Sequence, residues 1–188
     1  MLSDKVKELI EKSRIVSFDW QHPTAAIEIF QQADNEGRFL TDEEIDKIKT
    51  ITPSLSESLA RGKVLRDNVS DIVSSARRVV LDTYPDLTEP GGGLYPPMRA
   101  EACWRDFWHF MRCISYGISS QALNYTSDRG LGYMEQLYQE LQVPLNAMIL
   151  GLQQLKVFSL QRFEPSQQQN LEPYFDRLIE SMSQFSMA

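Results

Sequence analysis

The residues best suited to chemistry lie close together near the middle of the chain, where Cys103, Arg105 and Asp106 occur within a few positions. On a helix, side chains three positions apart share a face, so the thiol and the carboxylate would lie one turn apart. A thiol can form a covalent bond, a carboxylate accepts hydrogen bonds, and a guanidinium pairs with carboxylates. We therefore predict that a ligand docks here. The alternative is a small buried thiol beside a plain ion pair.

A helix from about Pro97 to Leu123 must position these side chains, because apolar residues recur there at helical spacing. One stripe of this helix is bulky and is predicted to face the core; it contains Trp104, Phe107, Trp108, Met111, Ile114 and Ile118. The stripe roughly opposite contains Arg99, Cys103, Asp106, Phe110 and Cys113. His109 lies at the edge of this second stripe, and we interpret it as packed rather than catalytic.

The rest of the chain predicts an all-α protein of about eight helices, since helical periodicity recurs nearly everywhere and no clean period-two alternation occurs. Thr41 and Glu44 form the signature of a capping box, which marks a helix start. The other predicted helices begin near Ser3 and Pro23, follow Pro53 up to Pro85, span Asp128–Gln142 and Pro144–Phe163, and start at about Pro165. The segment between Pro85 and Pro97 is rich in proline and glycine and is predicted to be a long ordered loop.

Composition excludes several classes of function. The 188-residue chain has a net charge of −7 and scattered basic residues, which argues against nucleic acid as a partner. No apolar run approaches the roughly 20 residues of a membrane-spanning helix, so we expect a cytoplasmic protein. On one helix Cys103 and Cys113 would be about 15 Å apart, too far for a disulfide. Neither a metal-ligand grouping nor a nucleophile–base pair is visible, so we expect no metal and no enzymatic activity.

The central segment resembles the allophycocyanin and phycocyanin subunits of cyanobacterial light-harvesting antennae. The residues that carry this resemblance are Pro85-Asp86, Pro90-Gly91-Gly92, Tyr95, Arg99, Cys103-Trp104-Arg105-Asp106, Arg112 and Tyr116-Gly117. Weaker matches are Gly37-Arg38-Phe39-Leu40, Leu141-Gln142-Val143-Pro144 and Tyr174-Phe175-Asp176. The resemblance implies a globin-like phycobiliprotein fold in one domain of residues 1–188, with residues 1–36 as an N-terminal helical extension and residues 37–188 as the core.

The resemblance also implies a cofactor, a linear tetrapyrrole (bilin) such as phycocyanobilin. In that family a cysteine matching Cys103 holds the bilin by a thioether, and the residue matching Asp106 accepts hydrogen bonds from pyrrole N–H groups. Positions matching Arg105 and Arg99 pair with the propionates. Tyr116 also matches a family residue, and we include His109 among the candidate contacts. We expect the thiol to face a cleft beside cationic groups. The implied partners are other phycobiliprotein subunits or a second copy of the chain.

The chain departs from the family where the antenna subunits have "RDLDYYLR", because Arg105-Asp106 is followed by Phe, Trp, His and Phe and both tyrosines are lost. Such departures indicate a divergent accessory member rather than a bulk antenna subunit. Two functions stay open. The first is a bilin-binding protein. The second is an accessory protein without a stable chromophore, which assists bilin biosynthesis, delivery or phycobilisome assembly and turnover through contacts with proteins such as the bilin-making enzymes. It would work in the cytoplasm or at the cytoplasmic face of the thylakoid. A bilin lyase is disfavoured, because only Asp106 and His109 offer acid–base chemistry.

Overall fold

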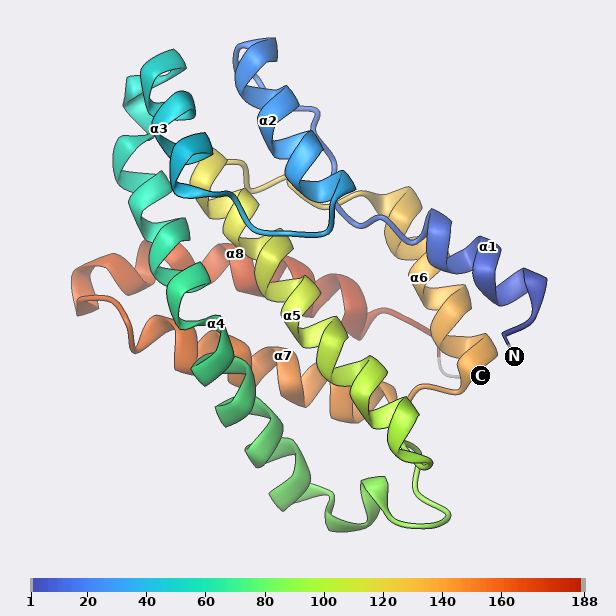
Figure 1. The fold of residues 1–188 in the computed structure, drawn as a ribbon. Coiled ribbons are helices and arrows are strands. Elements are labelled where there is room, and N and C mark those ends of the chain that lie inside the picture. Colours follow the sequence, from blue (N-terminus) through green and yellow to red (C-terminus); the bar gives the residue numbers. More distant parts are fainter. Residues whose placement is uncertain (1, 187–188) are drawn as a thin grey trace.

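The computed structural model describes residues 2–186, and these form an all-α protein with no β-strand (Figure 1). Its eight α-helices are α1 (Asp4–Lys12), α2 (Thr24–Asn35), α3 (Asp42–Ile51), α4 (Ser56–Thr83), α5 (Pro97–Ser120), α6 (Asp128–Leu141), α7 (Leu145–Leu160) and α8 (Pro165–Ser183). Two short 3-10 helices, η1 (Pro53–Leu55) and η2 (Pro85–Thr88), precede α4 and follow it. The prediction of about eight helices is confirmed. The segment predicted as a loop without regular structure differs at its start, where η2 forms.

Local sequence signals set the starts of several helices. Ser3 caps α1 by accepting a hydrogen bond from the backbone N–H of Val6 at 3.2 Å. The capping box predicted at α3 is present, because Thr41 and Glu44 each accept a hydrogen bond from the other's backbone N–H. The guanidinium of Arg38 holds the Glu44 carboxylate at 2.7 and 2.8 Å, which fixes the turn before α3.

Helix α5 runs through the middle of the molecule, with α4, α7 and α8 packed against it (Figure 1). Glycines allow the close approach of neighbouring helices. A Cβ on Gly151 of α7 would lie 1.9 Å from the Phe107 ring, and one on Gly62 of α4 would lie 1.9 Å from the Ser119 hydroxyl. A Cβ at either position would force the Phe107 ring or the Ser119 hydroxyl to move, so these two glycines allow α7 and α4 to lie close to α5.

The predicted core stripe of α5 is buried with one exception. Trp108 is 36% exposed, so its assignment to the core is wrong. It lies beside the exposed face of α5, where its ring is covered only in part by an edge contact with Phe39, with ring centroids 4.7 Å apart. Phe110 and Cys113, predicted on the stripe opposite the core, are also buried. This half of α5 is enclosed from both sides, because α2 and the loop after it cover the face that α4 and α7 leave open.

A buried ion pair joins α2 to α5. Asp34 and Arg112 are each 7% exposed, and their Oδ1 and Nη1 atoms are 2.5 Å apart. Arg112 also donates to the Tyr116 hydroxyl at 3.2 Å, and that hydroxyl donates to the backbone carbonyl of Arg38. Arg14 reaches the other carboxylate oxygen of Asp34 at 2.8 Å. One carboxylate therefore connects the N-terminal segment, α2, α5 and the loop before α3.

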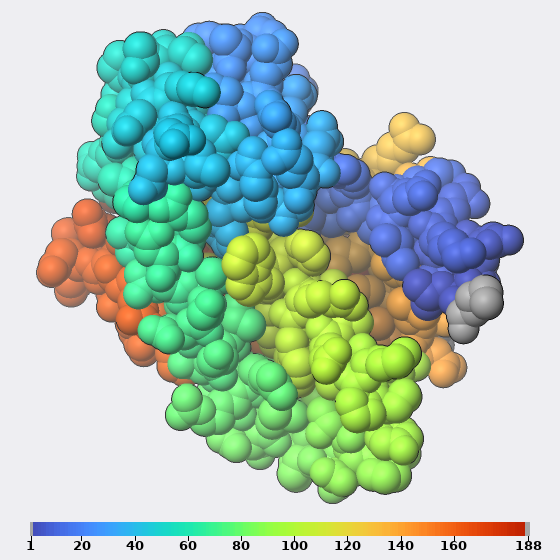
Figure 2. Space-filling model, in the orientation of Figure 1, coloured from blue at the N-terminus to red at the C-terminus, as the bar shows by residue number. Residues whose placement is uncertain are grey.

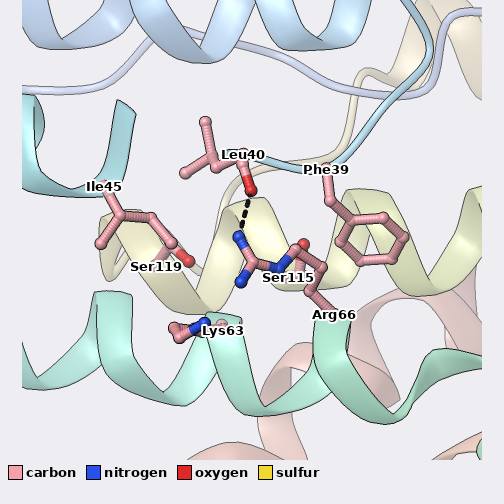
Figure 3. Close-up of a pocket in the computed structure, with 8 residues that line it drawn as sticks. Phe39, Leu40, Ile45, Lys63, Arg66, Ser115 and Ser119 are labelled. Carbon is pink, nitrogen blue, oxygen red and sulfur yellow. Dashed lines mark hydrogen bonds between the residues drawn. The ribbon is translucent and has the colours of Figure 1, made fainter. Parts of the chain in front are cut away.

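The loop between α2 and α3 is also held from α4, as the close-up in Figure 3 shows. Arg66 of α4 donates to the backbone carbonyl of Leu40 at 2.8 Å. The cavity beneath this contact, between Phe39, Ile45, Lys63 and Ser115, has a volume of about 10 Å³. Such a volume has room for a single water and for no larger ligand.

We predict that Asp34→Asn lowers the free energy of unfolding by about 3–5 kcal/mol, because it leaves the Arg112 charge buried without its counter-ion. Chemical denaturation measures this loss. The control is Asp46→Asn, which removes an exposed pair with Lys49 and should cost less than about 1 kcal/mol. Equal, small losses for the two variants would contradict the prediction.

Candidate functional site

The first half of α5 reaches the molecular surface between α4 and the N-terminal segment, where its atoms are visible in the space-filling view (Figure 2). The pair predicted from the sequence lies on this part of the helix. Cys103 is 4% exposed, and Asp106, one turn further along, is partly exposed. Asp106 accepts a hydrogen bond from the hydroxyl of Tyr138 on α6, at 2.8 Å. The structure thus brings Cys103, Asp106 and Tyr138 together.

Tyr138 was not predicted as a site residue. It lies on the buried face of α6 with Leu131 and Met134, so its spacing indicates only a core position. Its ring also makes an edge contact with Phe185 after α8, with centroids 6.2 Å apart. The chain beyond α8 is held on α6 here, since the backbone N–H of Ser186 donates to Glu135 at 2.6 Å. Segments far apart in the sequence therefore meet at Tyr138.

Burial controls the chemistry of the Cys103 thiol. Burial, helped by the nearby Asp106 carboxylate and opposed by Arg99, raises the pKa of Cys103 to about 12. The thiol is therefore protonated at neutral pH. The expectation that this thiol faces a cleft is wrong for this structure, because packing encloses the sulfur. The expected cationic influence is present in Arg99, but the Asp106 carboxylate acts on the thiol as well.

Burial acts on Asp106 in the same direction. It raises the pKa of this carboxyl from 3.8 to about 6, against the opposing effects of the Tyr138 hydrogen bond and the Arg105 charge. A carboxylate in this place lacks the solvation that an anion needs, and a cationic or N–H-rich ligand could supply it.

The predicted arginines differ in their surroundings. Arg99 donates to the backbone carbonyls of Leu141 and Gln142, at 2.6 and 3.1 Å, and so holds the C-terminal end of α6. Arg105 is exposed and makes no ion pair within residues 2–186. His109 is exposed near Arg105, so its interpretation as a packed side chain is wrong.

Two further aromatic residues of α5, Tyr116 and Trp104, lie outside the Cys103–Asp106 pair. Tyr116 is fully buried and belongs to the Asp34–Arg112 network, three to four helical turns beyond Cys103, or about 20 Å along an ideal helix. Trp104 lies under the guanidinium of Arg77, 5.1 Å from the ring centroid. The indole N–H of Trp104 is buried and finds no hydrogen-bond acceptor in the described part of the chain. Trp104 was predicted as a core residue, and its burial confirms this.

Comparison with known proteins decides the family. Residues 28–182 match the sequence model of the family described as "Phycobilisome protein". The chain belongs to the phycobilisome protein family. It is 32% identical to the allophycocyanin alpha-B chain of Cyanidium caldarium over 154 residues, which cover 81% of this chain and 94% of the relative. It is also 32% identical to the C-phycocyanin-2 beta subunit of Microchaete diplosiphon over 132 residues, which cover 70% and 77% of the two chains.

Membership of the phycobilisome protein family confirms the resemblance seen in the sequence and the globin-like, all-α fold class. It also supports the prediction of a phycobiliprotein rather than an enzyme. Among residues 2–186, none of the helices is both long enough and apolar enough to cross a membrane. Histidine, cysteine and acidic side chains do not gather into a metal-binding group in that range.

We predict that both cysteines resist thiol reagents in the folded protein, because burial keeps each thiol protonated and enclosed. Ellman's reagent at pH 8 should react at least about 100-fold more slowly with native protein than with protein in guanidinium chloride. Cys103→Ser should release one thiol fewer after denaturation. Fast reaction of one native thiol that disappears in Cys103→Ser would contradict the buried position of this residue.

The raised pKa of Asp106 predicts a pH-dependent stability. The folded protein holds this proton more tightly than the unfolded chain, so stability is lost as the pH rises from about 4 to about 6. Asp106→Asn keeps an acceptor for Tyr138 and removes the charge. We expect it to raise the free energy of unfolding by about 1–2 kcal/mol at pH 8 and by almost nothing at pH 4. Denaturation curves at several pH values measure the difference, and parallel pH profiles for the two proteins would refute it.

Proposed function

We propose that the chain binds a linear tetrapyrrole, phycocyanobilin or another bilin, on the first half of α5. The observation that carries this proposal is the pairing of Cys103 and Asp106 one turn apart, in a chain whose relatives are named allophycocyanin and phycocyanin. When bound, the bilin supplies absorption of visible light. The protein supplies the attachment residue and the hydrogen-bonding groups.

The hydrogen-bonding groups of the site fit a bilin. Asp106 accepts one hydrogen bond, from Tyr138, and a carboxylate has further lone pairs for pyrrole N–H groups. A protonated pyrrole system beside Asp106 would stabilise the carboxylate that burial disfavours, so binding would lower the pKa of this residue. Tyr138 orients the carboxylate on α5. We propose these two residues as the hydrogen-bonding partners of the site.

Cys103 is the residue for covalent attachment. Its S–H would add across an exocyclic carbon–carbon double bond: the sulfur bonds to one carbon, the proton goes to the other, and no group leaves. Because the thiol is buried and protonated, attachment requires the packing around Cys103 to open and a base to take the proton. Among residues 2–186, Asp106 is the one carboxylate that acts on the thiol, and its own hydrogen bond goes to Tyr138, so we expect attachment to depend on a lyase.

The arginines and His109 surround this pair. Arg105 is exposed and free of ion pairs within the described residues, which suits it to a propionate. Arg99 uses Nη2 alone for the carbonyls at the end of α6, which leaves its Nε and Nη1 donors for a propionate. His109 lies on the exposed side of α5 near Arg105, at the rim of the site. Tyr116 would act indirectly, by fixing α5 against the loop before α3.

A second candidate function is that of an accessory protein without a stable chromophore, which assists bilin biosynthesis, delivery or phycobilisome assembly and turnover. The observation that favours it is the length of chain outside the family match, since residues 1–27 precede the matched region. Phycobiliprotein subunits or bilin-making enzymes would be its partners, at the cytoplasmic face of the thylakoid. The division at residues 36 and 37 into extension and core stays a prediction.

We expect the chain to become coloured when it is expressed with bilin-synthesis enzymes and a suitable lyase. Absorption spectra detect the bilin, and zinc-induced fluorescence on a denaturing gel detects its covalent bond. Cys103→Ala should abolish the fluorescent band completely. Asp106→Asn should keep the band but weaken visible absorption relative to the near-ultraviolet by about twofold or more, because the anion opposite the pyrroles is lost.

The outcomes separate the two functions. Colour that survives denaturation in the parent protein and disappears in Cys103→Ala supports the bilin-binding function. A protein that stays colourless with every lyase tested would refute that function and leave the accessory function, for which capture of a bilin-pathway protein is the positive result.

A further inference from the structure

The C-terminal half of α6 covers the Cys103–Asp106 pair. Cys103 lies one turn from Arg99 and one turn from Asp106 on the same face of α5. Both of these neighbours bond α6: Asp106 accepts from Tyr138 at 2.8 Å, and Arg99 donates to the two carbonyls at the end of α6, at 2.6 and 3.1 Å. Cys103 lies between the two contacts and is 4% exposed, so α6 closes this face of α5 over the thiol.

Helix α6 is held less firmly by the core than its neighbours are. Helices α4 and α7 pack closely on α5, whereas α6 packs mainly on α1 and to a smaller extent on α8. Between α5 and α6, the described residues meet through side chains rather than by close backbone packing. Figure 1 shows α1 and α6 side by side at the edge of the molecule. Compared with α4 and α7, α6 is therefore the helix whose displacement would disturb the core least.

The residues before α2 form a strap that follows α6 from its start to its end. The strap is defined here as residues 4–22; it comprises α1 and the segment after it, and it precedes the region that matches the family. Just before α6, the N–H of Ser17 donates to the Tyr125 carbonyl at 2.7 Å, and the N–H of Ser127 donates to the Ile15 carbonyl at 2.8 Å. The two segments thus pair as an antiparallel bridge.

Further along, α1 runs antiparallel to α6 and contacts it through charged side chains. The Lys12 ammonium lies 5.3 Å from the centroid of the Tyr133 ring, and Lys5 pairs with Glu140 at 2.5 Å. Glu140 follows Tyr138 by two residues, so the strap reaches the part of α6 that covers the thiol.

We propose that the strap is a latch that holds α6 closed over Cys103. While the strap is docked, α6 keeps the thiol enclosed and Tyr138 on Asp106. When the strap is released, α6 loses its main packing partner and moves away, and the thiol becomes accessible. The S–H of Cys103 can then add to a bilin double bond, so the strap controls the opening that attachment requires. This last step rests on the proposed function, whereas control of thiol access by the strap does not depend on it.

Two glycines of α6 supply a matched pair of variants. The strap backbone crosses α6 at Gly130, where a Cβ would lie 1.7 Å from the carbonyl oxygen of Arg14 and 3.2 Å from the Cα of Ile15. A Cβ at Gly132 would meet open space. Gly130→Ala should displace the strap without removing a buried group, and Gly132→Ala is the control with the same gain in helix propensity.

Two neighbouring residues of α1 supply a second pair, which leaves α6 unchanged. Leu9 is 5% exposed and lies on the face of α1 that packs on α6, whereas Ile10 is 48% exposed. Leu9→Ala should weaken the packing of the strap, and Ile10→Ala is its control. Because it only shortens one side chain, Leu9→Ala tests the latch even if Gly130→Ala does not fold.

The full-length protein without bilin and these variants are treated with iodoacetamide at pH 8, and mass spectrometry follows the alkylation of each cysteine. Hydrogen exchange at Ser17 and Ser127 reports whether the strap is docked. We expect both strap variants to exchange these amides and to alkylate Cys103 at least about tenfold faster than the parent protein, because release of the strap frees α6. Cys113, which is buried on the second half of α5, should stay as slow as in the parent, and both controls should match the parent throughout.

Three results would overturn the latch. If the strap amides exchange faster while Cys103 stays as slow as in the parent, α6 is closed without the strap. If neither strap variant exposes these amides, or if Cys113 becomes reactive together with Cys103 in both, the strap is not separable from the fold. If the controls react as fast as the strap variants, the effect does not come from the strap.

Attachment of a bilin by a lyase is measured separately, by zinc-induced fluorescence, and should be faster in the two strap variants than in the parent. An unchanged rate with an accessible thiol would show that the strap does not control attachment. Absence of attachment in every protein would refute the proposed function, and the alkylation of Cys103 would still decide whether the strap is a latch.

Discussion

The fold depends on one buried carboxylate. Asp34 would be costly to bury alone, and it is stable only because Arg112 and Arg14 reach it from two directions. These bonds fix α2 on α5 and place the loop that leads to α3. The same arginine on α5 meets Tyr116, whose hydroxyl reaches the Arg38 carbonyl. These bonds position α2 and the loop before α3 on the second half of α5, whereas the candidate site lies on its first half.

Burial, more than neighbouring charge, determines the protonation states of Cys103 and Asp106 at that site. Cys103 and Asp106, on the first half of α5, are both held towards their neutral forms by burial. A ligand that brings positive charge and N–H donors next to Asp106 would therefore stabilise the ionised form of this carboxylate. Arg112 differs, because the protein supplies its counter-ion at hydrogen-bond distance. Asp106 is bonded by the neutral hydroxyl of Tyr138, and the Arg105 charge acts on it without forming an ion pair.

The sequence predicted local features well, because their causes are local. The capping box at Thr41, the helix start at Ser3 and the helix around Cys103 all follow from neighbours in the chain. Long-range packing explains the rest. Trp108 has the spacing of a core residue but is covered only in part, by Phe39. Tyr138 also has the spacing of a core residue, but its hydroxyl bonds Asp106. No periodicity indicates which distant segment covers a given face.

The Arg99 side chain connects two parts of the structure, because it lies on α5 near Cys103 and donates hydrogen bonds to the end of α6. Gln142 ends α6 in a left-handed conformation, with φ of 50°, which costs a residue other than glycine about 1 kcal/mol. Arg99 holds the carbonyl of this strained residue and that of Leu141. Both bonds are donated by Nη2, so a carboxylate can pair with Nε and Nη1 while the two carbonyls stay bound. If the carboxylate draws the guanidinium towards itself, it pulls on the turn between α6 and α7. Binding of a carboxylate at Arg99 would then change how firmly the turn between α6 and α7 is held.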